Sequence, residues 1–345
     1  MKTLLCSESV EVLEALLRLI QVGVGGFGRS WTDIVDSSEL WDAVAYVDIN
    51  EEALKEAAAA HEMPKDRCFK DLESALASVE ADAALIVVPP KVHMEIALQS
   101  LKAGLHVLIE KPLADTMENA KRIVSEADKR SLKLMVSQNY RFRRGARTVR
   151  RLIETGKVGN PSYAVVNFHK APRFRGFRLR MDHPLLIDMA IHHFDTMRYI
   201  FNSDPSSIYC ETWRPKWSWF KGDPCATVMI KMENGVRLTY VGSWVSLGWE
   251  TTWDGDWRIE CSEGGIYWNE KVKSKLRDSV NEVTERFVPM PLEDRAYSLY
   301  EFAEAIRKDR EPETSGQDNL KSLAMVFASL ESAESGKSVS VNKYL

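Results

Sequence analysis

Two short segments carry side chains that could do chemistry together. One holds Lys111, just beyond the apolar run His106–Ile109, where its ammonium group could meet a substrate oxygen. The other holds Asp188, His192 and Asp195, which recur at i, i+4 and i+7 and so share one face of a helix. A carboxylate one turn from an imidazole can orient the ring and stabilise its charged form, which suits a general base. Taken singly, such residues are often only a solvated lysine and a helix-surface pair.

A glycine-rich turn supplies a candidate phosphate cradle. Residues 21–28 read QVGVGGFG, a GxGxxG register that directly follows an apolar run. The first glycine allows a tight turn, the second lets the backbone approach a pyrophosphate, and the third permits close packing of helix on strand. Unpaired N–H groups at the start of the next helix favour the negative charge of that pyrophosphate. The cofactor contacts expected in this turn are Gly23, Gly25, Gly26, Phe27 and Gly28.

Asp48 indicates which dinucleotide binds. It lies twenty residues beyond Gly28, at the end of the next β-rich run. A carboxylate there accepts hydrogen bonds from the adenosine ribose hydroxyls and repels a 2′-phosphate. Ile49 and Asn50, which follow, offer no arginine to hold that phosphate. The sequence therefore predicts NAD as the cofactor, with NADP less favoured.

The elements that must position these groups alternate between strand and helix from Leu19 to about Ser137. Such alternation indicates βαβ units and a Rossmann-type, doubly wound parallel sheet. Lys111 then follows the fourth strand, at the sheet edge where open α/β sheets bind ligands. The predicted strands are Leu19–Val24, Ala43–Val47, Ala83–Val88, His106–Ile109 and Leu132–Val136. The predicted helices are Asn50–His61, Lys91–Ala103 and Asp115–Arg130.

After residue 140 the pattern changes to α+β. Asn234-Gly235, between two β-rich runs, predicts a tight hairpin. The second half should therefore contain a large, mostly antiparallel sheet. Its predicted strands are Tyr163–Lys170, Ser207–Arg214, Ala226–Met232, Val236–Val245 and Trp257–Cys261, and its predicted helices are Arg143–Glu154, Leu299–Arg307 and Asn319–Ser335.

We accordingly expect an N-terminal extension over residues 1–17, a dinucleotide-binding domain over 18–138 and a substrate and oligomerisation domain over 139–345. Closing helices at about 314–335 could pack back on the first domain. Apolar residues at helical spacing over residues 10–20 leave open either a short amphipathic helix or an extension without a functional role.

Composition narrows the class of protein. Hydrophobic residues make up 45% and charged residues 28% of the 345, as in globular proteins. The net charge of −4 provides no overall attraction to nucleic acid or anionic membranes. No run approaches the roughly 20 apolar residues of a bilayer span. Five scattered cysteines without a CxxC, and glutamates that interrupt any signal-peptide core, predict reduced thiols and a cytoplasmic location.

Together these segments resemble the glucose–fructose oxidoreductase/inositol dehydrogenase/rhizopine-catabolism (Gfo/Idh/MocA) family. The resemblance covers about residues 18–340 and rests on GVGGFG, the EKP at 110–112, NYRFRRGARTVRRLIETGKVG and the Asp-x₃-His-x₂-Asp pattern. It implies that Lys111 contacts the reacting hydroxyl and that Asp188 and His192 complete a catalytic triad. It further implies cofactor contacts at Pro89, His93, Glu110 and Lys111, and substrate contacts at Arg141, His169, Asp188 and His192.

The resemblance implies an NAD-dependent oxidoreductase that moves hydride between the cofactor and a secondary alcohol of a sugar, an inositol or a sugar-acid derivative. His192 would take the hydroxyl proton, Lys111 would donate to the developing alkoxide, and Asp188 would hold the imidazole. A homodimer or homotetramer is expected, with the second sheet as a self-association face. The family often has glycines where this chain has residues 183–186, which leaves the identity of the substrate open.

Three other classes remain. An NAD-using lyase or glycoside-cleaving enzyme of the same family would accumulate no NADH. A non-catalytic nucleotide-binding regulator would need neither Lys111 nor the Asp188–His192 pair. A metal site formed by Asp188, His192, His193 and Asp195 is disfavoured, because adjacent histidines point about 100° apart on a helix, so we expect no metal.

Two further clusters leave alternatives open. Eight of the ten tryptophans lie between Trp213 and Trp268, which suits a packed interface or carbohydrate stacking. Four arginines precede the Asp188 segment and could clamp an acidic substrate group or form a solvated loop. They are Arg173, Arg175, Arg178 and Arg180.

Overall fold

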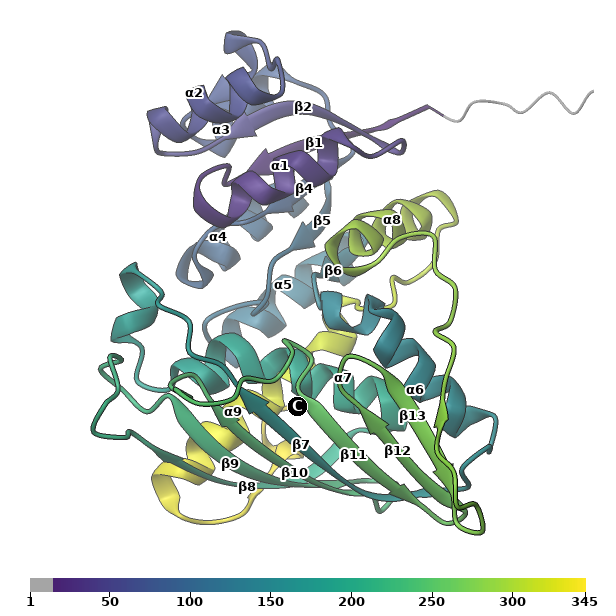
Figure 1. Cartoon of the computed structure of the whole chain (residues 1–345). Helices are drawn as coiled ribbons and strands as arrows, with labels where there is room; N and C mark the ends of the chain where they lie inside the picture. The colour runs from purple at the N-terminus through teal and green to yellow at the C-terminus, as the bar shows by residue number, and fades with distance from the viewer. Residues whose placement is uncertain (1–14) are drawn as a thin grey trace, which may run out of the picture.

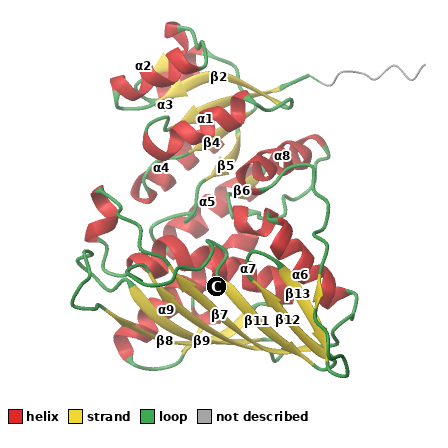
Figure 2. Cartoon of the chain, in the orientation of Figure 1, coloured by secondary structure: helices red, strands yellow, loops and turns green. Residues whose placement is uncertain are grey.

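The computed structural model describes residues 15–345, which form two domains, each built on one sheet (Figures 1 and 2). Within these residues the first sheet has six strands in the order β3-β2-β1-β4-β5-β6, and every neighbouring pair is parallel. The predicted Rossmann-type arrangement is confirmed. The strands are β1 (Leu17–Val22), β2 (Trp41–Val47), β3 (Cys68–Phe69), β4 (Ala83–Ile86), β5 (His106–Ile109) and β6 (Leu134–Val136).

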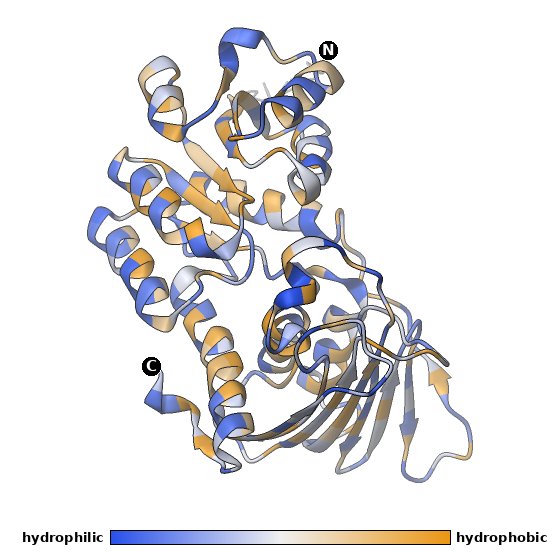
Figure 3. Cartoon of the chain, turned by 90° about the vertical axis from the view of Figure 1, so that its left-hand side faces the viewer, coloured by the Kyte–Doolittle hydropathy of each residue, from blue (hydrophilic) through white to orange (hydrophobic). Residues whose placement is uncertain are grey.

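Helices cover both faces of this sheet, so its central strands are buried and appear as hydrophobic ribbons in Figure 3. Asn50 accepts hydrogen bonds from the first turn of α2, and Thr116 caps α5, so these two helices start one and two residues later than predicted, whereas α4 starts one residue earlier. The short β3 and α3 were not predicted. The helices are α1 (Arg29–Asp36), α2 (Glu51–Ala60), α3 (Leu72–Ser78), α4 (Pro90–Lys102) and α5 (Met117–Arg130).

The second sheet has nine strands in the described chain, in the order β14-β13-β12-β11-β7-β10-β9-β8-β15. Only the β7–β10 pair is parallel, and β9 and β10 form the predicted hairpin at Asn234-Gly235. The mostly antiparallel sheet is therefore confirmed. The strands are β7 (Pro161–His169), β8 (Pro205–Trp213), β9 (Cys225–Met232), β10 (Arg237–Ser243), β11 (Asp256–Cys261), β12 (Gly264–Trp268), β13 (Val272–Leu276), β14 (Val283–Thr284) and β15 (Val339–Ser340).

Four helices of the described chain follow the first domain. α7 (Ile191–Phe201) packs against α6 (Arg144–Glu154) and α9 (Gly316–Ser335), α6 contacts β12 and β13, and α9 contacts β8 and β15. α9 also packs on α5, and Thr314, just before α9, donates to the carbonyl of Val136. α8 (Asp294–Arg307) lies beside the first sheet, where Phe302 stacks on Trp41 of β2 (Figure 1). The last helices therefore join the two domains.

The first strand begins inside the segment for which an N-terminal amphipathic helix was possible. Leu17 and Ile20, which were part of the possible amphipathic helix, lie in β1, so that helix cannot include them. The rest of that pattern falls outside the described residues. Among residues 15–345, no helix combines the length and the apolar character that crossing a membrane requires.

Candidate active site

The turn between β1 and α1 has the shape of a dinucleotide cradle. A Cβ added to Gly23, whose φ is +92°, would lie 2.1 Å from the carbonyl oxygen of Val87, and one on Gly28 would lie 2.2 Å from that of Gly23. These two positions therefore require glycine. The turn borders a cleft of about 1260 Å³. Of the predicted cofactor contacts, the residues that line this cleft are Gly23, Gly25, Gly26, Asp48 and Pro89.

Asp48 braces the same turn. Its Oδ2 accepts hydrogen bonds from the backbone N–H groups of Val24 (3.0 Å) and Gly25 (3.1 Å), and its Oδ1 accepts from Asn50 N–H (2.9 Å). The carboxylate is half-buried at the end of β2 and still borders the cleft. An acidic side chain in this position fits the two ribose hydroxyls of NAD.

Phe27 and Glu110 make contacts that the sequence did not indicate, Phe27 with α8 and Glu110 with α1 and Lys111. Phe27 is exposed, and the guanidinium of Arg295, from α8, lies over its ring at 4.7 Å. Trp31 of α1 donates through Nε1 to Glu110 Oε1 at 2.8 Å, and Glu110 Oε2 accepts from Lys111 N–H at 3.1 Å. Burial raises the pKa of Glu110. Glu110 is therefore held inside the fold, where it fixes the turn at Lys111 and does not line the cleft.

His93 likewise supports the Lys111 turn. Its ring nitrogens face the carbonyl oxygens of Pro112 (2.9 Å) and Val88 (2.8 Å), and the side chain is fully buried. Burial lowers its pKa. The cofactor contact expected of His93 cannot come from its ring, which is enclosed by the two loops that it joins.

Lys111 and Asp188 meet although they are 77 residues apart. Lys111 Nζ donates to Asp188 Oδ1 at 2.8 Å and to the Asp188 carbonyl at 2.7 Å. Arg178 Nε donates to the other carboxylate oxygen, Oδ2, at 2.6 Å. Burial disfavours the charged form of Asp188, but the charges of Lys111 and Arg178 outweigh it and hold its pKa below the ordinary value. Asp188 is therefore an anion bridging two cations.

The backbone around Asp188 departs from the predicted single α-helix. Leu185–Ala190 is a π-helix, and α7 begins only at Ile191. The wider π turn changes the i, i+4 alignment on which the Asp188–His192 pairing was based. Asp188 contacts Lys111 and Arg178 instead of the imidazole, so the expectation that Asp188 holds His192 is wrong.

His192 is a neutral, unpartnered imidazole. Its ring stacks on Tyr140 with centroids 4.3 Å apart, and the residue is only 7% exposed. Nδ1 is buried, and neither ring nitrogen has a hydrogen-bond partner within the described chain. Burial, followed by the positive charges of Lys111 and Arg143, lowers its pKa well below 6.5. The ring is therefore unprotonated at neutral pH and has a free nitrogen lone pair, and Tyr140 rather than a carboxylate orients it.

The other polar residues of this segment are already paired. Arg141 Nη2 donates to Asp195 Oδ1 at 2.7 Å and to Asp318 Oδ2 at 2.6 Å. Its guanidinium is therefore taken up inside the second domain, which contradicts the expected substrate contact. His193 has Tyr240 Oη 3.2 Å from Nδ1 and the Trp253 carbonyl 3.0 Å from Nε2. The described residues contain no group of three or more His, Cys, Asp or Glu side chains arranged to hold a metal ion.

The remaining candidates divide between core and surface. His169, at the end of β7, is half-buried with Nδ1 3.2 Å from Ser246 Oγ, and burial lowers its pKa.

The tryptophan cluster divides between core and surface. Trp257 and Trp268 stack in the core at 5.3 Å, whereas Trp217 and Trp249 are exposed. Neither a packed interface nor carbohydrate stacking therefore accounts for the whole cluster.

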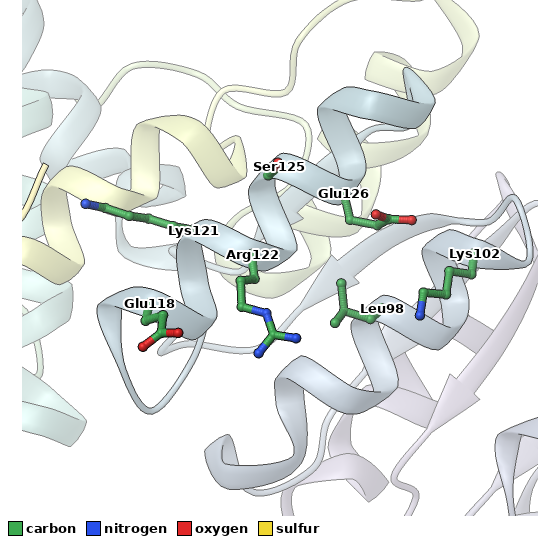
Figure 4. A pocket seen from close by; sticks show the side chains of 7 residues that line it. All are labelled: Leu98, Lys102, Glu118, Lys121, Arg122, Ser125 and Glu126. Atoms are coloured by element: carbon green, nitrogen blue, oxygen red, sulfur yellow. The ribbon is translucent and has the colours of Figure 1, made fainter.

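A second, separate groove lies between α4 and α5 (Figure 4). Arg122 and Leu98 face each other across it, whereas Lys121 points away and donates to the Leu345 carbonyl. The groove contains neither the glycine turn nor a candidate catalytic residue.

Comparisons with known proteins agree with this geometry. Residues 17–138 match the model of an oxidoreductase family with an NAD-binding Rossmann fold, and residues 146–267 match the Gfo/Idh/MocA C-terminal domain. An uncharacterized protein of Sinorhizobium fredii is 30% identical, over 95% of this chain and 96% of that protein. D-apiose dehydrogenase of Paraburkholderia graminis is 27% identical, over 92% of this chain and 88% of that protein.

Among solved structures, an oxidoreductase from Agrobacterium radiobacter in complex with NAD+, L-tartaric acid and magnesium has the same fold. Its TM-score is 0.88 at 20% identity, and the match covers 96% of this chain and 100% of that one. With the cradle at Gly23 and Gly28 and the carboxylate of Asp48, this chain is an NAD-dependent oxidoreductase and belongs to the Gfo/Idh/MocA family.

Proposed function

We propose that this enzyme interconverts a secondary alcohol and a ketone on a sugar, an inositol or a sugar-acid derivative. The observation that carries the proposal is that the Lys111 ammonium, beyond the carboxyl end of β5, lies near enough to the buried, unpartnered imidazole of His192 for its charge to lower the pKa of that ring. NAD, when bound, supplies the hydride acceptor. The similarity to D-apiose dehydrogenase supports a sugar-type substrate.

Each side chain has a distinct part in this proposal. Lys111 uses two of its three N–H donors on Asp188, which leaves one for the substrate oxygen. His192 takes the hydroxyl proton, and the stacked Tyr140 ring fixes its position. Asp188 holds the Lys111 ammonium in place through an ion pair. Positioned proton transfer and charge stabilisation of this kind each contribute about 10²- to 10⁴-fold in rate.

The test is a screen of sugars, inositols and sugar acids with NAD, followed by absorbance of NADH. Lys111→Ala should lower kcat/KM for the best substrate by about 10²- to 10⁴-fold. Its affinity for NAD should change little, because the cradle is built from other residues. Lys129→Ala, on the exposed face of α5, is the matched control.

Two outcomes would contradict this assignment. Normal turnover by Lys111→Ala would remove Lys111 from the chemistry. Consumption of a substrate without net NADH would favour the lyase or glycoside-cleaving alternative.

We also propose that the enzyme is a homodimer or homotetramer that associates through the second sheet. The strand registers place Tyr163, Met229 and Tyr267 on one face of that sheet, and all three are exposed. Light scattering should report a dimer or larger, and Met229→Lys should shift it toward the monomer, because a buried unpaired charge opposes association. A monomeric wild type would refute the proposal.

A further inference from the structure

Arg178 is a cation in the candidate active site that the proposed chemistry does not use. It lies in the 3-10 helix Gly176–Arg180, on the segment that rises from the end of β7 toward the first domain (Figure 1). Asp188 holds Nε, and the guanidinium carbon lies 5.3 Å from the Phe174 ring centre and 4.9 Å from that of Phe177. Its two terminal amino groups have no hydrogen-bond partner within residues 15–345. The guanidinium is therefore fixed at one edge and available at the other.

Asp188 and its two partners together carry one more positive than negative charge, and burial of the neighbouring Glu110 raises its pKa and so favours its neutral form. Lys111 and Arg178 are both cations, Asp188 supplies one negative charge, and the imidazole of His192 is neutral. The nearby carboxylates are already matched elsewhere, Asp195 by Arg141 and Asp254 by Arg143. In this partly buried setting an uncompensated charge acts more strongly than it would in water.

We propose that Arg178 anchors a carboxylate of the substrate, so that the enzyme acts on acidic sugars or polyhydroxy acids. This inference rests on the proposed function and specifies its substrate class. The planar fork of a guanidinium matches a carboxylate with two parallel hydrogen bonds, and a single negative charge neutralises the excess.

The position of the two cations also limits where the acid group can lie. Lys111 and Arg178 bind opposite oxygens of the same Asp188 carboxylate. A hydroxyl on Lys111 and an acid group on Arg178 are therefore close in the bound substrate. The reacting hydroxyl and the carboxylate are therefore expected at the same end of the substrate.

The other arginines of the segment provide a matched control. Arg173 lies over the ring of Trp219 at 3.5 Å, and Arg175 and Arg180 are exposed. They contribute only a long-range attraction, which physiological salt largely screens. Arg175→Gln removes the same charge as Arg178→Gln without touching Asp188.

The experiment compares matched acid and neutral compounds, D-gluconate with D-glucitol and D-glucuronate with D-glucose. Arg178→Gln should lower the ratio of kcat/KM for acid to that for neutral compound by about 10- to 100-fold, the range for a lost hydrogen bond to a charged group. The ratio cancels any effect that the variant exerts through Asp188. Arg178→Lys keeps the charge without the planar guanidinium, so its ratio should lie between those of the wild type and Arg178→Gln. Arg175→Gln should change the ratio by less than about 3-fold.

Calorimetric binding of gluconate and glucuronate to the NADH-saturated enzyme separates this inference from the proposed function. If the wild type turns over none of the four compounds but binds the acids, and Arg178→Gln abolishes that binding, the anchor holds while the proposed reaction does not. An unchanged ratio in Arg178→Gln, an equal loss in Arg175→Gln, or no binding of either acid by the wild type would overturn the anchor.

Discussion

Two charged clusters lie close together on the segment that begins with the π-helix Leu185–Ala190 and continues as α7, and they differ in how completely their groups are paired. Asp195 is 1% exposed and accepts from Arg141 through both oxygens and from the hydroxyl of Ser322. Asp188 holds Lys111 and Arg178, each of which keeps N–H groups without a partner in the described structure. His192 adds an unpartnered imidazole.

The difference separates a structural cluster from a binding one. Buried polar groups in folded proteins are nearly always hydrogen-bonded, so the Asp195 cluster has no remaining capacity for a ligand. The free donors and the imidazole around Asp188 are groups that a substrate can satisfy. Asp188 and Asp195 occupy one short sequence pattern, but only the partners of Asp188 keep unpaired donors in the described structure.

The largest expected effects come from exchanging the two carboxylates for amides. Asp195→Asn should lower the free energy of unfolding by about 3–5 kcal/mol, because it leaves the buried Arg141 without its main partner. Asp188→Asn should cost less than about 2 kcal/mol, since Lys111 and Arg178 both reach water, but it should lower kcat/KM by at least about 10²-fold. Chemical denaturation and NADH absorbance measure the two effects. Equal losses of unfolding free energy in the two variants would contradict the claim that Asp195 contributes more to stability than Asp188.

The sequence predicted the parts of this site that depend on local pattern. The glycine turn, Asp48 and the strand before Lys111 follow from spacing and from the alternation of strands and helices, and the structure contains all three. Asn234-Gly235 marked its hairpin for the same reason.

The predictions that failed concern contacts between residues that are far apart in the sequence. Neither the contact between Trp31 and Glu110 nor that between Lys111 and Asp188 leaves a signal in local spacing. The π-helix altered the register on which the Asp188–His192 pairing was based. Sequence spacing also could not show that Asp195 captures Arg141, because packing of three separate elements brings them together.

Asp48 shares features with both carboxylates. Like Asp195 it accepts hydrogen bonds inside the fold, here from backbone N–H groups, and it also borders a cleft where it can meet a ligand. Asp48→Asn should weaken NAD binding by about 10- to 100-fold, because charge-assisted hydrogen bonds to the ribose are lost. It should weaken NADP binding less, since the repulsion of the 2′-phosphate disappears. Quenching of tryptophan fluorescence measures both dissociation constants. Asp42→Asn, on an exposed position of β2, is the control. Parallel losses for NAD and NADP would show that Asp48 only braces the turn.

Both ring nitrogens of His193 have hydrogen-bond partners, and the contribution of this buried residue to stability can be tested by varying the pH. Burial lowers its pKa to about 4, whereas an unfolded histidine has a pKa near 6.5. The unfolded state therefore binds more protons below pH 6.5, so the stability due to this group is complete above that pH and is lost as pH falls toward 4. The slope is about 1.4 kcal/mol per pH unit. His193→Gln should reduce the slope of unfolding free energy by this amount between those limits. Identical slopes in variant and wild type would refute the assignment.

The smallest expected effect comes from replacing Arg295, a residue of α8 that contacts the glycine turn. Its guanidinium lies over Phe27 and donates to Ser30 Oγ at 2.6 Å, so it holds the glycine turn from the second domain. An exposed cation–π contact contributes about 0.5–1 kcal/mol, so Arg295→Ala should weaken NAD binding by about 2- to 5-fold. Arg295→Lys should restore part of that loss, because an ammonium retains the cation–π contact. The same fluorescence titration measures both variants. If Arg295→Ala weakened NAD binding as much as Asp48→Asn, Arg295 would have to contact the cofactor itself, because bracing the turn alone does not account for a loss of that size.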